Sequence, residues 1–340
     1  MPDALMLLLL FLLTVVLVYG VRHYALRFLL DTPNHRSAHQ LPTPRGGGLA
    51  CVLAFVVAAV YLFAINRLLL HELGLVAIGL IVAGVGFWDD HRHVPARWRL
   101  LAHFCAALLV MLCLQGLPTV PLPFAFGELD LGWSGYLLGL LFLVWVLNLF
   151  NFMDGADGIA ASEALFVSAG LAGFMWGINV NLALLALSLA VVCLGFLVWN
   201  WPPAKIFMGD VGSSFIGFML GVLILLFSHT NSLFGIMGLI LFAVFVVDAS
   251  VTLFRRVLTG HKCYEAHCDH AYQRLVRRYQ PNGHFRVVTG MTLINIGYLL
   301  PLATIAFKVP NYAWMCLMLA YIPLIVLAYL FKAGSQSFNG

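Results

Sequence analysis

The chain has 340 residues, of which 62% are hydrophobic and only 9% are charged, with a mean hydropathy of +0.98 and a formal net charge of +4. This composition excludes a soluble globular domain, and we expect no nucleic-acid partner. Runs of about 18–20 apolar residues recur, which is the length that crosses ~30 Å of hydrocarbon. We therefore predict an all-α polytopic membrane protein that forms one domain over residues 1–340.

The apolar runs predict about eleven transmembrane helices. They cover residues 4–21, 46–66, 72–88, 99–117, 133–150, 159–177, 180–198, 212–229, 232–254, 287–307 and 311–331. Asp3 precedes the first run and Arg22 follows it, so that run is expected to be an anchor with an outer N-terminus and not a cleaved signal peptide. Most of the seven cysteines lie inside these runs and are interpreted as core residues.

The basic residues predict the orientation. If eleven helices alternate, every one of the 18 Lys and Arg residues except Arg67 and Lys308 falls on a single side. The positive-inside rule makes that side cytoplasmic, with the N-terminus outside and the C-terminus inside. On the outer side, apolar residues alternate near 120–131 around Gly127, which predicts a small β-hairpin. The polar segments 22–45, 89–98, 148–158, 199–211 and 255–286 are then five cytoplasmic loops.

The first polar loop carries Arg36 and Arg45 and ends in three glycines at 46–48. Arginine forks bind phosphate oxygens, and glycines let backbone N–H groups approach an anion closely. An ordinary positively charged cytoplasmic loop explains the same residues equally well.

The second loop begins with Asp89 and Asp90. Adjacent carboxylates at a helix end persist where a cation neutralises them or where one serves as a base. A charge-balanced turn is the alternative, because three arginines follow.

The third loop, residues 148–158, is the most informative. Asn148 and Asn151 are three residues apart, as are Asp154 and Asp157, so each pair shares one helix face. Carboxylates at a membrane boundary lose hydration and need a partner or a metal. Oxygen ligands of this kind suit Mg²⁺.

In the fourth loop, Asp210 lies between two glycines just before an apolar run, and Lys205 can reach a phosphate. A simple helix cap is the competing interpretation of Asp210. In the fifth loop, His267, His270 and Arg274 suggest a grip on phosphates. The neighbouring cysteines invite a zinc interpretation, but their spacing matches no usual zinc finger.

Two further carboxylates, Glu163 and Asp248, lie inside apolar runs. We expect them to pair with basic groups or to cap a helix locally.

Together and in this order, the polar motifs resemble those of the polyprenyl-phosphate N-acetylhexosamine-1-phosphate transferases, or glycosyltransferase family 4, which includes the phospho-MurNAc-pentapeptide translocase. The resemblance covers nearly the whole chain. It rests on Pro33-Asn34-x-Arg36-Ser37-x-His39, Pro42-Thr43-Pro44-Arg45-Gly46-Gly47-Gly48, Asp89-Asp90, Asn148-x-x-Asn151-Phe-Met-Asp154-Gly-x-Asp157-Gly158 and Phe207-Met208-Gly209-Asp210-x-Gly212-Ser213.

The resemblance implies transfer of N-acetylhexosamine-1-phosphate from a UDP-sugar to undecaprenyl phosphate, giving UMP, with Mg²⁺ or alternatively Mn²⁺. It makes Asp210 the leading metal ligand, with Asp154 and Asp157 positioning metal and diphosphate. It makes Asp89 the base, beside Asp90, in a direct attack. The implied substrate-binding residues are Asn148, Asn151, Lys205, Arg36, Arg45, His267, His270 and Arg274.

The segment His267-x-x-His270-x-Tyr272-Gln273-Arg274 is similar to the O-antigen-initiating branch, which argues against a MurNAc-pentapeptide donor. The implied setting is the bacterial inner membrane with a cytoplasmic site, and a homodimer is left open. A polytopic transporter is the main rival, although the acids cluster on one face. A CDP-alcohol phosphatidyltransferase would need a longer run of aspartates.

Overall fold

The computed structural model describes residues 3–31, 42–123, 126–260 and 269–335. Arg36 and His267 therefore lie outside the described residues. The helices and strands are α1 (Asp3–Phe28), β1 (Leu30–Asp31), β2 (Thr43–Pro44), α2 (Gly48–Ala64), α3 (Leu70–His91), α4 (Ala96–Cys113), β3 (Val120–Pro121), β4 (Glu128–Leu129), α5 (Gly132–Met153), α6 (Ile159–Met175), α7 (Val180–Asn200), α8 (Asp210–Thr230), α9 (Leu233–Leu241), α10 (Ala243–Leu258), α11 (Ala271–Arg278), α12 (Gly283–Ile294), the π-helix η2 (Asn295–Leu299), α13 (Leu300–Lys308), the 3₁₀-helix η3 (Pro310–Tyr312) and α14 (Ala313–Leu330).

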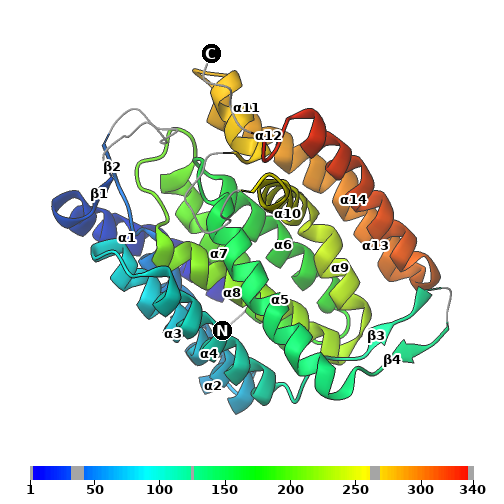
Figure 1. The fold of residues 1–340 in the computed structure, drawn as a ribbon. Helices are drawn as coiled ribbons and strands as arrows, with labels where there is room; N and C mark the ends of the chain where they lie inside the picture. The colour runs from blue at the N-terminus through cyan, green and yellow to red at the C-terminus, as the bar shows by residue number, and fades with distance from the viewer. Residues whose placement is uncertain (1–2, 32–41, 124–125, 261–268, 336–340) are drawn as a thin grey trace.

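The described chain is a bundle of helices, as Figure 1 shows. Eight helical segments are long and apolar enough to cross a membrane, or nine if the bent pair α9–α10 is one span. Two further apolar helices, α2 and α6, have 17 residues each. The prediction of an all-α multi-pass membrane protein is confirmed. Each predicted run overlaps one helix or a broken helix, with ends that differ by several residues. The count of eleven spans and their orientation stay predictions.

Helix α8 is the centre of the bundle. Its apolar window is wholly buried, whereas the windows of α1 and α4 are less than one third buried. Large side chains such as Phe215 and Phe218 fill the space around it. Glycines let the neighbours approach closely, since a Cβ on Gly48 of α2 would lie 2.2 Å from the Cα of Gly212. The first residues of α8 are therefore fixed against α2 and α3.

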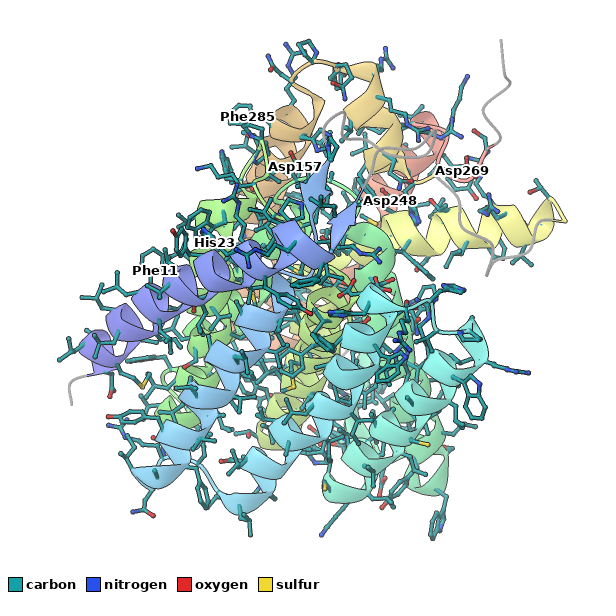
Figure 2. The ribbon with its side chains drawn as sticks, turned by 90° about the vertical axis from the view of Figure 1, so that its left-hand side faces the viewer. Phe11, His23, Asp157, Asp248, Asp269 and Phe285 are labelled. Atoms are coloured by element: carbon teal, nitrogen blue, oxygen red, sulfur yellow. The ribbon has the colours of Figure 1, made fainter. Side chains whose placement is uncertain are left out.

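Helices α9 and α10 are bent by 73° relative to each other. In the turned view of Figure 2, the yellow helix α10 runs across the direction of the other helices. The labelled residues Asp157, Asp248 and Asp269 lie at that same end of the bundle. A single transmembrane helix was predicted over 232–254. The bend instead carries the polar end of α10 towards the loops of the candidate site.

Two small antiparallel pairs lie at opposite ends of the bundle (Figure 1). At one end, β1 pairs with β2 through Leu30–Pro44 and Asp31–Thr43. At the other end, β3 pairs with β4 through Val120–Leu129 and Pro121–Glu128. The second pair lies in the segment predicted as a hairpin, but its strands have only two residues each. Its location on the outer face stays a prediction.

Candidate active site

Backbone pairing brings the first and fourth polar loops together. The Phe207 N–H donates to the Pro44 carbonyl at 2.8 Å, and the Gly48 N–H donates to the Met208 carbonyl at 2.8 Å. Gly46 and Gly209 have φ of +90° and +74°, a conformation that side-chain-bearing residues rarely adopt. A Cβ on Gly209 would lie 2.8 Å from the Gly46 nitrogen. The glycines thus allow two loops to meet where α2 and α8 begin.

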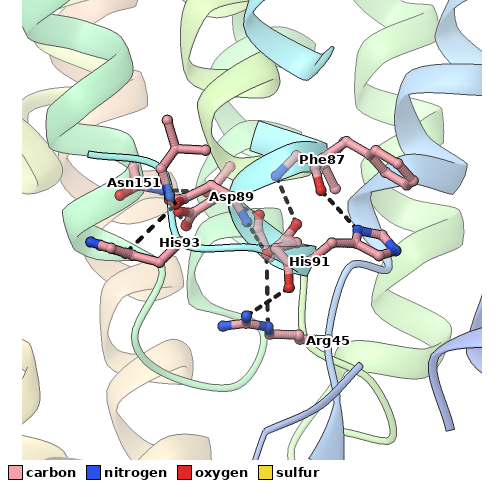
Figure 3. A network of polar contacts seen from close by, with 12 residues as sticks. Arg45, Phe87, Asp89, His91, His93 and Asn151 are labelled. Atoms are coloured by element: carbon pink, nitrogen blue, oxygen red, sulfur yellow. Dashed lines mark hydrogen bonds and ion pairs between the residues drawn. The ribbon is translucent and has the colours of Figure 1, made fainter. Parts of the chain in front are cut away.

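Asp90 binds the start of α8. Its two carboxylate oxygens accept from the backbone N–H groups of Asp210 and Val211, each at 3.1 Å. The Arg45 guanidinium donates to the Asp90 carbonyl at 2.7 Å. Figure 3 shows Arg45 and Asp89 within this network of polar contacts. A carboxylate on otherwise unpaired N–H groups stabilises a helix start. Asp210 itself was the residue predicted, as an alternative, to cap this helix. The cap is instead supplied by Asp90, so the Asp210 carboxylate is not used as a cap.

Arg99 of α4 joins two carboxylates of the site. It donates to the carboxylate of Asp89 and, at 3.2 Å, to that of Asp210. The other Asp89 oxygen accepts from the Val94 N–H at 2.7 Å. Both Asp89 and Asp90 are buried, and the Arg99 side chain is 33% exposed. The acidic pair is thus neutralised within the protein by an arginine and by helix N–H groups.

Asn151 connects the third loop to this cluster. Its Nδ2 lies 2.9 Å from Oδ1 of Asp210 and 2.8 Å from the Ser213 hydroxyl. Asn148, one turn earlier on α5, donates to the carbonyl of Val144 in its own helix. The structure therefore brings together Asp89, Asp90, Asn151 and Asp210 from three helices. Among the described residues, no hydrogen bond joins the Asn148 side chain to them.

Asp154 differs from the other acids of the cluster. Among the described residues, no hydrogen bond or ion pair reaches its side chain. Burial, and then the nearby charges of Asp210, Asp90 and Asp157, raise the pKa of Asp154 well above its usual value. A carboxylate without a partner, near other carboxylates, attracts a cation or a proton.

Asp157 is held by two other segments. Its carboxylate accepts from the Ala204 N–H at 3.0 Å, and its own backbone N–H donates to Nδ1 of His284 at 3.0 Å. The next N–H, of Gly158, donates to the Asn200 side chain at 2.9 Å. Lys205 is exposed, and its Nζ lies 5.6 Å from the centre of the Trp199 ring. The third and fourth loops and α12 therefore meet at Asp157.

The described part of the fifth loop is tied to α10. His270 is 2% exposed, and its Nδ1 lies 3.4 Å from Oδ1 of Asp248. Asp248 also accepts from the N–H groups of Ala271 and Tyr272 at 2.9 Å each, so it caps α11 as predicted. Arg274 contacts the carboxylate of Asp269 at 3.4 Å. His270 and Arg274, the two described residues of this loop that were predicted to bind phosphates, therefore both lie beside carboxylates of the protein.

Glu163 pairs with an amide, where a basic group or a local helix cap was expected. One of its oxygens accepts from Nδ2 of Asn295 at 2.6 Å, inside the bundle.

Mg²⁺ often takes only one or two carboxylates together with waters and substrate phosphates. Within the described ranges, no group of three or more His, Cys, Asp or Glu side chains forms a complete ligand set. The unpartnered carboxylate of Asp154 and the partly exposed carboxylate of Asp210 are oxygen donors of the right kind. This donor set fits a hard cation that is completed by a phosphate-bearing substrate.

Sequence reasoning gave no role to four residues that contact the acids or the loop after α5. They are Arg99 at Asp89, Ser213 at Asn151, Tyr272 at the Phe152 carbonyl and His284 at Asp157. Arg99 stood in a run of three arginines and Ser213 in a quoted motif, so both were visible but had no distinguishing signal. Only the packing of α4 beside α3 shows which arginine reaches the acids.

Comparisons with known proteins show which proteins this chain is similar to. The family model described as glycosyl transferase family 4 matches residues 72–228. A probable undecaprenyl-phosphate N-acetylglucosaminyl 1-phosphate transferase of Bacillus subtilis is 29% identical over 322 residues, which is 92% of this chain and 87% of that protein. A decaprenyl-phosphate N-acetylglucosaminephosphotransferase of Mycobacterium leprae is 31% identical over 287 residues, 75% of this chain and 71% of that protein.

A phospho-N-acetylmuramoyl-pentapeptide-transferase of Moorella thermoacetica is 33% identical over 237 residues, covering 65% of this chain and 72% of that protein. The range 72–228 that the family model matches includes Asp89, Asn151 and Asp210. The chain therefore belongs to glycosyl transferase family 4, the superfamily of polyprenyl-phosphate N-acetylhexosamine-1-phosphate transferases.

Proposed function

We propose that this protein transfers N-acetylhexosamine-1-phosphate from a UDP-N-acetylhexosamine to undecaprenyl phosphate at the cytoplasmic face of a bacterial inner membrane. A phosphate oxygen of the lipid attacks the sugar-bearing phosphorus of the donor. The P–O–P bond breaks, and UMP leaves. The products are undecaprenyl-diphospho-N-acetylhexosamine and UMP.

The observation that carries the proposal is the meeting of Asp89, Asp90, Asn151 and Asp210 at one end of a membrane-type bundle. The donor is a soluble anion and the acceptor is a lipid phosphate, so their reaction needs a site at the bilayer edge. Two anions repel each other, and catalysis of phosphoryl transfer is mainly positioning and charge stabilisation. The cluster offers acids for a metal and arginines for phosphates in one place.

Mg²⁺, or Mn²⁺ in its place, would be held by Asp210 and Asp154 and would supply charge stabilisation for the diphosphate. Asp157 and Asn151 would keep these carboxylates in place. The charge of Arg99 is now shared between Asp89 and Asp210. A lipid phosphate entering the site would draw Arg99 towards itself, and the freed Asp89 carboxylate would then accept the phosphate proton as the base.

The demand on that base is modest. By analogy with phosphorylated side chains, the second pKa of a phosphate monoester is about 6, so most of the acceptor is already a dianion at neutral pH. Asp90 would remain on the start of α8. Arg45, Lys205 and Asn148 would line the path of the phosphates.

The fifth loop, with His267, His270 and Arg274, is proposed to act on the donor, together with Arg36 of the first loop. Arg274 lies beside Asp269, so a donor phosphate would compete with that carboxylate for the guanidinium. The burial of His270 means that it would act through the placement of α11 and not by touching the donor.

An apolar cavity supports the acceptor assignment. It has a volume of about 260 Å³, and Met153, the residue before Asp154, is one of the residues that line it. Side chains of α10, α12 and α14, among them Val244, Val287 and Leu324, line it. A prenyl chain could lie there while its phosphate reaches the acids.

We further propose that the donor is a GlcNAc, GalNAc or 6-deoxy-HexNAc nucleotide, and that the product starts an O-antigen or related surface polysaccharide. The segment from His270 to Arg274 supports this branch. The relatives named above include enzymes for N-acetylglucosamine and for phospho-N-acetylmuramoyl-pentapeptide, so the donor must be measured.

The test is a panel of UDP-HexNAc donors, incubated with purified protein, undecaprenyl phosphate and Mg²⁺. Release of UMP together with a labelled lipid diphosphate is expected with at least one donor. Uptake of label into sealed proteoliposomes without UMP would instead support the transporter. Neither product nor uptake, with protein that remains folded, would count against the proposed reaction.

A further inference from the structure

Helices α11 and α12 hold the loop at 152–157 from both of its ends. This loop carries the two carboxylates Asp154 and Asp157. Neither helix belongs to the same segment of the chain as the loop, and more than 100 residues separate them in sequence. In Figure 1 the two helices lie next to each other at one end of the bundle.

The first contact comes from α11. The Tyr272 hydroxyl donates to the carbonyl of Phe152 at 3.0 Å, and Tyr272 is 3% exposed. The same hydroxyl fills the space beside Gly155, where an added Cβ would lie 2.2 Å from it. The backbone between Phe152 and Gly155 is therefore in close contact with Tyr272. A side chain at position 155 would clash with the tyrosine hydroxyl.

The second contact comes from α12. Nδ1 of His284 accepts the Asp157 backbone N–H at 3.0 Å, and its side chain is 13% exposed. Nδ1 also lies 3.3 Å from Oδ1 of Asp157. The backbone bond requires a lone pair on Nδ1, which a neutral ring with its proton on Nε2 supplies. His284 thus fixes the backbone at the end of the loop.

The two helices are themselves anchored. Asp248 of α10 accepts both N–H groups at the start of α11. The start of α12 packs tightly on α11, since a Cβ on Gly283 would lie 1.9 Å from the Val276 carbonyl oxygen. Deeper in the bundle, Asn295, the first residue of η2 after α12, bonds to Glu163 of α6, the helix that follows the loop. The two helices that contact the loop are therefore themselves fixed by contacts with α10 and α6.

We propose that Tyr272 and His284 are positioning residues that hold the 152–157 loop in the shape that presents Asp154 to the substrates. This inference rests on the proposed function. Tyr272 contacts the Phe152 carbonyl and His284 contacts the Asp157 N–H, so both side chains act on the backbone of the loop. Displacement of a catalytic group by about 1 Å can cost around 100-fold in rate. Among the described residues, no hydrogen bond or ion pair holds the Asp154 side chain.

The test uses the full-length protein and the variants Tyr272→Phe, His284→Ala and His284→Asn. The first two each remove one contact, and we expect kcat to fall about 10- to 100-fold with a smaller change in donor KM. Asparagine can place an acceptor near the position of Nδ1, so His284→Asn should recover much of the loss. The Tyr272→Phe effect should be small in an Asp154→Ala background.

Tyr298→Phe is the matched control. It removes another tyrosine hydroxyl bond, at 2.6 Å to the Leu319 carbonyl, which joins two helices away from the loop. If Tyr272→Phe and Tyr298→Phe lowered Tm alike and both kept kcat within twofold, the hydroxyl at 272 would be merely structural. The proposal would then be overturned.

Hydrogen exchange provides a readout that does not depend on the reaction. The Asp157 amide should exchange faster in His284→Ala than in the wild type or in His284→Asn. Equal exchange in all three proteins would contradict the clamp, even if activity fell. If the wild type released no UMP from any donor, the proposed function would fail while this measurement still tested the clamp.

Discussion

Asn151 and Asp210 are joined by a hydrogen bond of 2.9 Å that links the end of α5 to the first residue of α8. The two residues are 59 positions apart in the chain. The amide donates, so it stabilises the ionised carboxylate, and the Ser213 hydroxyl fixes the amide in turn. The partly exposed carboxylate of Asp210 is thus held in one orientation.

Replacement of Asp210 by asparagine should abolish turnover while the protein stays folded. The change removes a proposed metal ligand but leaves the Asp90 contacts with the start of α8, which use backbone N–H groups. Loss of such a ligand removes several kcal/mol of transition-state charge stabilisation. UMP release and Tm should be measured together, with the exposed Asp130→Asn as control. Near-normal activity of Asp210→Asn at ordinary Mg²⁺ would refute the assignment.

Replacement of Asp154 by asparagine should stabilise the protein when Mg²⁺ is absent. Burial and neighbouring carboxylates raise the pKa of Asp154. A raised pKa in the folded state means that folding binds a proton. The stability that protonated Asp154 contributes is therefore full below its unfolded-state pKa and is lost as pH rises through the raised pKa. At neutral pH and in EDTA, the Tm of Asp154→Asn should therefore exceed that of the wild type. Added Mg²⁺ should raise the Tm of the wild type more.

A Tm for Asp154→Asn that is lower than the wild-type value in EDTA would argue against an uncompensated charge at this position. An equal gain with Mg²⁺ in both proteins would show that Asp154 does not hold the ion.

Replacement of Asp89 by asparagine should mainly lower kcat, with little change in KM for the UDP-sugar. Asp89 is the proposed base. It accepts a hydrogen bond from Arg99, which the acceptor phosphate is proposed to draw away. The assay needs saturating lipid phosphate, because acceptor binding also depends on this region. Loss of donor affinity with normal kcat would instead make Asp89 a binding or metal-positioning group. The base would then be sought at Asp90 or Asp157.

Replacement of His270 by alanine should raise the donor KM and lower kcat less steeply. Because His270 is buried against Asp248, its effect is expected to pass through the start of α11. Asp248→Asn should then produce the same change in KM. A KM effect of His270→Ala without any effect of Asp248→Asn would indicate direct contact with the donor.

The predicted topology can be tested by cysteine labelling in a background without native cysteines. Arg92→Cys and Arg277→Cys replace exposed residues and should react only with reagents that enter the cytoplasm. Lys308→Cys, also exposed, should react from outside. Labelling of position 92 or 277 from outside would overturn the eleven-span prediction.

The sequence by itself determined the class of the protein and most of the participants in the site. Apolar runs identify membrane helices because hydrocarbon requires every backbone polar group to be satisfied within the helix. Carboxylates and amides at the ends of such runs are costly to bury, so Asp90, Asn151 and Asp210 were visible as candidates without any structure. The order of the motifs was enough to indicate the family.

Only the tertiary structure decided which group contacts which. The bend between α9 and α10, the choice of Arg99 among three arginines and the contacts of Tyr272 and His284 with the 152–157 loop depend on helix packing. Packing joins residues that are distant in the chain, and local sequence patterns carry no record of those contacts. For the same reason Asp90, which reads as one of a pair of catalytic acids, proved to cap α8, whereas Asp154 has no partner among the described residues.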